Sequence, residues 1–423
     1  MSVILRANTD LVYLPDHGFV GEEGALRILP QITRHIHRLD ISHNLLGSAG
    51  TLTLFKGLTT LRARYSSDFG QRGTLWGLKE VNLAANGLDD SAFDGVLAYA
   101  KKDVLLRRVL MQGNSITLRN NLESIVNSLN ASHISTLSLT NNPGLDPPSV
   151  QQFFETIHSP HLRQLQISTS NFPSSIASSI ADYLRSPRSR DLEYLELNGN
   201  NLGEKGVAEI VDAVDENNFS IQALGLLANQ STTLGAVTEI DVENDVGTEA
   251  RERVLMADRE SEQASMEYQI HRRLPILLER NRILTSRIRK AALKTLVPAR
   301  IVLNALPPSD EDIAQRVISD VSTGSTYSGF RLLDLPEEVV QLIVRHSSGD
   351  STAFSDDQWT RLRREATDKD SLQRSIQARE ERLKARGLGM GAGSMGDRDE
   401  RKEVDRQLRE DWLRRGQWDR WER

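Results

Sequence analysis

The chain has 423 residues and a formal net charge of −6, with 38% hydrophobic and 26% charged residues. Cysteine is absent, which excludes disulfide scaffolds, thiolate metal sites and cysteine nucleophiles. The first ten residues do not resemble a secretory signal, and no run of about 18 apolar residues occurs, so we expect no membrane association. These features favour a protein of the cytoplasm or the nucleus.

The charge is unevenly distributed along the chain. Residues 1–250 contain 19 Lys/Arg and 28 Asp/Glu, whereas residues 251–305 contain 12 Lys/Arg and 6 Asp/Glu. Because binding to a phosphate backbone requires a positive field, the acidic first half predicts no nucleic-acid partner.

A pattern of the form L-x-L-x-x-N-x-L recurs seven times in the first half, most clearly from Leu39 and from Leu195. Its asparagine position falls at Asn44, Asn86, Asn114, Asn142, Ser170, Asn200 and Asn229. Successive spacings are 42, 28, 28, 28, 30 and 29 residues. The first spacing exceeds 28 by 14 residues, the length of the polar segment 62–75, which we predict to be an inserted loop.

Each repeat predicts one strand and one helix. The alternating leucines share one side of a short strand, and the asparagine amide can bond the backbone of a neighbouring turn. A Gly-x-x-Gly segment allows a tight turn into an apolar helical run, as in residues 203–214. Because no repeat can bury its own apolar face, stacking is required, which predicts an α/β solenoid rather than an ordinary α/β domain.

This pattern resembles the leucine-rich repeat superfamily, in its ribonuclease-inhibitor-like class. The resemblance implies a solenoid over residues 1–235, with parallel strands on a concave face, helices outside and an N-terminal cap that includes the half-match from Gly18. Ser170 departs from the pattern, so we expect a looser turn there. Ribonuclease inhibitors are rich in cysteine and this chain has none, so the resemblance does not imply ribonuclease binding.

The resemblance also implies that residues between and beside the strand leucines face the inside of the solenoid. Their mixture of both charge signs, amides and one aromatic ring suits a protein partner better than a small apolar ligand, although they could also be merely solvated. The candidate partner-binding residues are Arg38, Asp40, Asn82, Arg107, Leu110, Gln112, Ser138, Gln166, Tyr194 and Glu196.

The second half differs in pattern. We predict an acidic loop over residues 236–250 and a mainly helical C-terminal region from residue 251. Residues 251–305 carry an apolar stripe at helical spacing and should cap the open end of the solenoid. Pro275 should kink this helix and Pro298 should end it. Four basic residues seven apart form one row, either a solvated face or a docking surface for an acidic partner or for the acidic repeats; they are Arg273, Arg280, Arg287 and Lys294.

Residues 306–364 predict a further helical segment. Within it, residues 332–346 (LLDLPEEVVQLIVRH) resemble the first helix of an F-box, and the alternative is a plain amphipathic helix pair. The resemblance implies contact with the adaptor of a cullin ubiquitin ligase. The matching residues are Leu335, Pro336, Glu338, Val339 and Ile343. A later helix should begin at Ser355 and bury Trp359.

Residues 365–423 are densely charged, and we predict a flexible tail in which Trp412, Trp418 and Trp421 order on binding or belong to a frayed terminus. No phosphate-binding loop, zinc-protease motif or nucleophile elbow is present, so we predict a non-enzymatic monomer with no catalytic residue, cofactor or metal. Its expected function is to bind a protein partner on the concave face.

Two alternatives remain. One is a substrate receptor of a cullin-type ubiquitin ligase. The other is a Ran-type GTPase activator, because such activators share this repeat class; Arg62, Arg64 and Arg72 of the predicted insertion are the candidate arginines.

Overall fold

A computed structural model describes residues 10–67, 76–230, 260–303, 335–350, 352–385 and 395–422. The chain divides into two compact units, Met1–Glu279 and Arg280–Arg423. We call them the solenoid unit and the helical unit, and each is described by itself.

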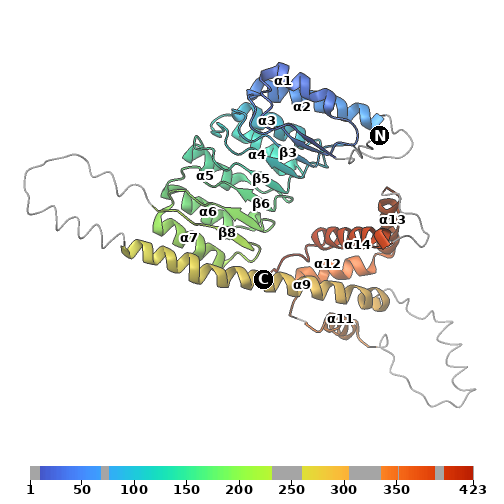
Figure 1. Cartoon of the computed structure of the whole chain (residues 1–423). Coiled ribbons are helices and arrows are strands. Elements are labelled where there is room, and N and C mark those ends of the chain that lie inside the picture. Colours follow the sequence, from blue (N-terminus) through green and yellow to red (C-terminus); the bar gives the residue numbers. More distant parts are fainter. Residues whose placement is uncertain are drawn as a thin grey trace, which may run out of the picture. The chain divides into compact units, whose positions relative to one another are not determined.

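The solenoid unit contains one parallel sheet of eight three-residue strands that pair in chain order (Figure 1). The strands are β1 Leu11–Tyr13, β2 Arg38–Asp40, β3 Glu80–Asn82, β4 Arg108–Leu110, β5 Thr136–Ser138, β6 Gln164–Gln166, β7 Tyr194–Glu196 and β8 Ala223–Gly225. Seven strands coincide with the predicted repeats, and β1 is an additional strand at the N-terminal end. The predicted α/β architecture of stacked repeats is therefore confirmed.

Helices follow the strands and lie together on one side of the sheet (Figure 1). They are α1 Gly21–Ile28, α2 Gly47–Ser67, α3 Asp90–Ala100, α4 Leu122–Ala131, α5 Pro147–Thr156, α6 Ala177–Arg185 and α7 Gly203–Glu216. The middle residue of each strand is buried and joins one continuous core with the helices. The core thus runs through the whole stack, as expected for repeats that cannot bury their apolar faces alone.

The asparagine position forms a buried ladder between repeats. Asn200, which is 1% exposed, donates from Nδ2 to the carbonyls of Ile167 (3.0 Å) and Leu197 (2.9 Å). Its Oδ1 accepts from the backbone N–H groups of Ser170 (3.0 Å) and Phe172 (3.2 Å). These bonds pair backbone groups that stacked turns would otherwise leave buried and unsatisfied. The Ser170 hydroxyl donates only to the carbonyl of Ser168 (3.2 Å), so this position makes fewer bonds between repeats.

The two glycines of the Gly-x-x-Gly segment have different roles. Gly203 has φ +69° at the turn into α7, a conformation that favours glycine. Gly206 lies inside α7, where an added Cβ would approach the Ala177 Cβ to 2.8 Å. The second glycine therefore permits close packing of α7 against α6 instead of shaping the turn.

The predicted inserted loop over 62–75 is partly wrong, because α2 continues to Ser67. Leu61 and Tyr65 pack against the core, and the Tyr65 hydroxyl donates to the carbonyl of Ile32 (3.1 Å). These tertiary contacts extend the helix into a segment whose polar composition predicted a loop. Residues 68–75 lie outside the described residues.

Part of the segment 251–305, predicted to cap the stack, packs on the core of the solenoid unit. Residues 260–268 are helical and are followed by a π-helical turn, Gln269–Arg273, and by α9, Leu274–Leu303. Leu274 and Leu277 are buried in the solenoid core. The Arg273 guanidinium pairs with Asp212 and with Asp215 (2.8 Å), both on α7, so one member of the basic row binds the acidic repeats. The predicted loop 236–250 lies outside the described residues.

The two prolines of this helix act differently from one another. Pro275 follows directly on the π-helical turn, a local distortion that accommodates its missing N–H and the bulk of its ring. The prediction that Pro298 ends the helix is wrong, because α9 continues to Leu303. Ala299 is fully buried in the core of the helical unit, with Val302 and Leu303 packed against it. Their burial offsets the roughly 3 kcal/mol that an interior proline costs.

The described residues of the helical unit form the rest of α9 and four further helices. These are α11 Glu337–His346, α12 Asp356–Thr367, α13 Lys369–Ala385 and α14 Met395–Arg415. Trp359 is buried as predicted. The prediction of a flexible tail over residues 365–423 is wrong, because α13 and α14 fill most of it and Trp412 and Trp418 lie in the core with ring centroids 4.2 Å apart.

Ion pairs explain why a charged segment is ordered. Arg379 pairs with Asp405 (2.6 Å) and Arg382 pairs with Asp411 (2.6 Å), each joining α13 to α14. These charged side chains of α13 and α14 are thus paired with one another instead of being exposed singly to solvent. Trp412 and Trp418 pack in the core and hold the end of the chain in place. Residues 386–394 lie outside the described residues.

A capping box begins α12, and we expect its removal to destabilise the helical unit. The Ser355 Oγ accepts from the N–H of Gln358 (3.1 Å), and the Gln358 side chain accepts from the N–H of Ser355 (3.2 Å). Ser355→Ala should lower the free energy of unfolding by about 1 kcal/mol, whereas Ser355→Asn, which caps without adding a charge beside Glu422, should retain most of it. Urea unfolding followed by tryptophan fluorescence measures this unit, because four of the five tryptophans lie in it. Equal stability of the alanine variant and the wild type would contradict the assignment.

Candidate protein-interaction face

The residues on either side of the buried strand centres form the face of the sheet opposite the helices, which we call the strand face. Strand pairing places the third residues of the strands in one row: Tyr13, Asp40, Asn82, Leu110, Ser138, Gln166, Glu196 and Gly225. The first residues form a second row: Leu11, Arg38, Glu80, Arg108, Thr136, Gln164, Tyr194 and Ala223. With strands about 4.8 Å apart, each row is about 34 Å long.

Eight of the ten candidate residues lie in these two rows. Gln112 lies beyond the end of β4, and its buried Oε1 has no hydrogen-bond partner among the residues that the structure describes. Arg107 precedes β4, and its guanidinium donates to the carbonyls of Val104 and of His133 (3.2 Å). Arg107 therefore joins the starts of two repeats, while its neighbour Arg108 occupies the strand face.

Several charges on the strand face are paired with neighbouring strands. Arg108 lies 3.2 Å from Glu80, and Asn82 donates to Asp40 (3.0 Å). Arg38 pairs with Asp10 at 2.7 Å, and this hydrogen bond lowers the pKa of the Asp10 carboxyl. These pairs cancel charge along the rows, so this face offers polar and apolar contacts instead of a strong field of one sign.

Two tyrosines and one leucine provide apolar area on this face. Tyr13 is 64% exposed, and Leu110 is half-buried near the middle of its row. The Tyr194 hydroxyl donates to Glu196 (3.0 Å), and partial burial together with this bond raises the pKa of Tyr194. Tyrosine supplies large contact area with few rotatable bonds, which suits protein interfaces. Sequence reasoning missed Tyr13, because β1 lacks the asparagine position by which the repeats were found.

Of the candidate arginines of a GTPase activator, Arg62 is held beside a buried acid. The Arg62 Nε lies 3.8 Å from the Asp103 carboxylate, which is fully buried and also accepts from the Tyr99 hydroxyl (2.8 Å) and the Leu78 N–H (3.1 Å). Arg62 therefore compensates a buried charge. Arg72 lies outside the described residues.

The F-box-like residues lie at the start of α11 and along it. Pro336 directly precedes the helix as its N-cap residue, and Leu335 is half-buried. Val340 and Val344 are buried, whereas Val339, Leu342 and Ile343 are 39%, 54% and 41% exposed. The three exposed apolar residues lie together on one side of α11.

Within the described ranges, no group of three or more histidine, aspartate or glutamate side chains is placed to hold a metal ion. None of the helices that the structure describes is long and apolar enough to cross a membrane. No protein-family model matches the chain. No curated protein matches it at a significant level either.

Proposed function

We propose that the solenoid unit is a leucine-rich repeat scaffold of the ribonuclease-inhibitor-like class that binds a protein partner on its strand face without catalysing a reaction. The observation that carries this proposal is the pair of in-register rows across eight strands, with exposed tyrosine and balanced charge. A surface about 34 Å long is suited to a protein partner, because small-ligand sites are enclosed pockets. Complementary charges on a partner can pair with the charged residues of the two rows and so fix the position of the partner along them.

Added charge on the strand face tests this function. Leu110 and Gln166 are half-buried residues of the third-residue row, so Leu110→Arg with Gln166→Arg should obstruct the face without opening the core. Gln152 and Ser178 are exposed on α5 and α6, so Gln152→Arg with Ser178→Arg adds the same charge elsewhere. In quantitative affinity purification with the full-length chain, the strand-face variant should retain less than about a tenth of the partner bound by the wild type. Equal retention by both variants would contradict the proposal.

The exposed face of α11 favours a second candidate, a substrate receptor of a cullin-type ubiquitin ligase. Three apolar side chains point away from the local core directly after the Leu335-Pro336 pair, as an adaptor-binding helix would require. Ile343→Asp should abolish co-purification of the adaptor, because a charge would be buried in the contact. Thr360→Asp, an exposed change on α12, is the control. Unchanged adaptor recovery with Ile343→Asp would reject this candidate.

A Ran-type GTPase activator has less support, because Arg62 is held by Asp103. If the rate of GTP hydrolysis by Ran is the same with and without this protein, the GTPase-activator candidate is rejected.

A further inference from the structure

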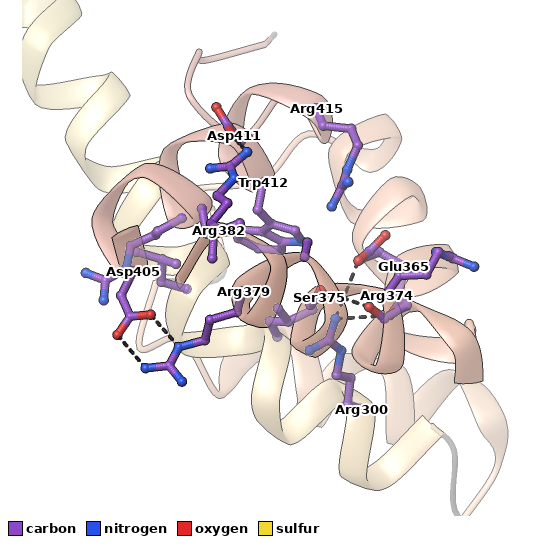
Figure 2. Close-up of a pocket in the computed structure, with 16 residues that line it drawn as sticks. Arg300, Glu365, Arg374, Ser375, Arg379, Arg382, Asp405, Asp411, Trp412 and Arg415 are labelled. Atoms are coloured by element: carbon purple, nitrogen blue, oxygen red, sulfur yellow. Dashed lines mark hydrogen bonds and ion pairs between the residues drawn. The ribbon is translucent and has the colours of Figure 1, made fainter. Parts of the chain in front are cut away.

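A cavity of about 590 Å³ lies within the helical unit, between α9, α12, α13 and α14 (Figure 2). Its volume is in the range of pockets that bind small organic molecules. Part of its wall is apolar and is formed by Leu293, Leu296, Ala378, Leu408 and Trp412. Neither the strand face nor α11 contributes a lining residue, so the pocket is independent of the proposed function.

The remaining wall is rich in arginine and contains no lysine. Four of the six lining arginines have acidic partners: Arg300 with Glu365 (3.4 Å), Arg374 with Asp368, Arg379 with Asp405 (2.6 Å) and Arg382 with Asp411 (2.6 Å). Arg409 on α14 lies close enough to Asp405 to help lower the pKa of that carboxyl, but Asp405 is already paired with Arg379, so the six lining arginines share four acidic partners. The pocket therefore keeps a surplus of two positive charges at its rim, where the side chains of Arg409 and Arg415 are exposed.

The pocket also holds buried donors without acceptors. Trp412 is 8% exposed, and its Nε1 has no hydrogen-bond partner among the described residues. The Nε of Arg300 is likewise buried and unpaired in this part of the chain. Figure 2 shows the Trp412 indole amid the labelled lining residues, with Arg415 and Arg300 on either side of it. Because an unpaired buried donor destabilises a fold, an oxygen acceptor brought in by a ligand would gain these bonds.

We propose that this pocket binds a small organic phosphate monoester. Such a group carries a charge of about −1.5 to −2 and three strong acceptor oxygens, which matches the surplus of two positive charges and the Trp412 N–H. A carboxylate would neutralise only one of the two arginines. Arginine forks suit phosphate oxygens, and the apolar wall can cover the organic part of the ligand.

Binding of phenyl phosphate to the full-length chain tests the proposal. At pH 8 and fixed ionic strength, isothermal titration calorimetry should show saturable binding with one site. Phenyl sulfate has the same shape with a single charge, and inorganic phosphate lacks the ring, so both should bind at least about tenfold more weakly. Equal binding of phenyl sulfate, or no saturable binding of phenyl phosphate, would overturn the proposal.

Variants locate the site. Arg409→Gln with Arg415→Gln should weaken phenyl phosphate binding at least about tenfold and leave the fold intact, because both side chains are exposed. Arg414→Gln removes the neighbouring exposed arginine, which is not a lining residue, and should leave the affinity within about twofold. Trp412→Phe keeps the ring, removes the N–H and should weaken binding severalfold. An unchanged dissociation constant in the double arginine variant would place binding elsewhere and reject the pocket.

Discussion

Asn200→Ala should lower the free energy of unfolding by about 3–4 kcal/mol, the larger of two strong effects expected in the solenoid. The substitution removes four hydrogen bonds and leaves the N–H groups of Ser170 and Phe172 and the carbonyl of Ile167 buried and unpaired, whereas the carbonyl of Leu197 keeps its bond from the Asn229 side chain (3.0 Å). Each such group costs about 1 kcal/mol or more when water reaches it poorly. Urea unfolding followed by far-ultraviolet circular dichroism measures the loss.

Ser170 provides the matched control, because it occupies the same position one repeat earlier. Its hydroxyl makes only the bond to Ser168, so Ser170→Ala should cost about 1 kcal/mol or less. Equal losses for Ser170→Ala and Asn200→Ala would show that the ladder does not carry the stability assigned to it.

Asp90→Ala should destabilise the solenoid by about 3 kcal/mol. Asp90, at the start of α3, is 2% exposed and accepts from the backbone N–H groups of Thr117 (2.7 Å), Leu118 (2.8 Å) and Asn120 (3.0 Å). The Thr117 hydroxyl adds a fourth bond at 2.6 Å. Alanine removes these four hydrogen bonds to a charged acceptor and leaves the N–H of the buried Leu118 without a partner, whereas the exposed Asn120 can bond to water; the summed loss is about 3 kcal/mol. Urea unfolding at pH 7 measures the effect.

The same carboxylate makes stability depend on pH. Burial raises the pKa of Asp90, but the bonds from Thr117, Asn120 and Leu118 outweigh it and lower the pKa below its usual value. A depressed pKa stabilises the fold above the unfolded value of about 4, and this contribution is lost as the pH falls through the folded value. The difference in unfolding free energy between wild type and Asp90→Ala should therefore shrink as the pH falls below about 4. Asp182→Asn, on an exposed side chain, is the control. A difference that is constant from pH 7 to pH 3 would contradict this assignment.

The repeat architecture could be predicted from sequence because its signal is periodic and local. The leucines and Asn200 recur at one spacing, and each repeat needs only its neighbours to bury its apolar side. The same regularity located the strand-face rows, whereas β1 and Tyr13 were missed because the asparagine is absent there.

Features that depend on distant residues could not be predicted. The extension of α2 to Ser67 depends on Tyr65 reaching Ile32, and the order of the tail depends on ion pairs between α13 and α14. The pocket brings Leu293 of α9 together with Trp412 and Arg415 of α14, residues more than a hundred positions apart. No local sequence pattern predicts contacts between residues so far apart. The charged composition of residues 365–423 instead suggested that this segment is exposed to solvent.

Photo-crosslinking tests the central claim, that the strand face contacts a protein partner, most directly. Benzoylphenylalanine is placed at Gln166, on the strand face, or at Gln152, on the exposed side of α5, in otherwise identical full-length chains. We expect a crosslinked product with one partner when the probe is at Gln166 and no corresponding product when it is at Gln152. The product from Gln166 should be lost when the same chain also carries Leu110→Arg. Crosslinking of the same partner from Gln152 alone would contradict the account and would move its binding surface to the helices.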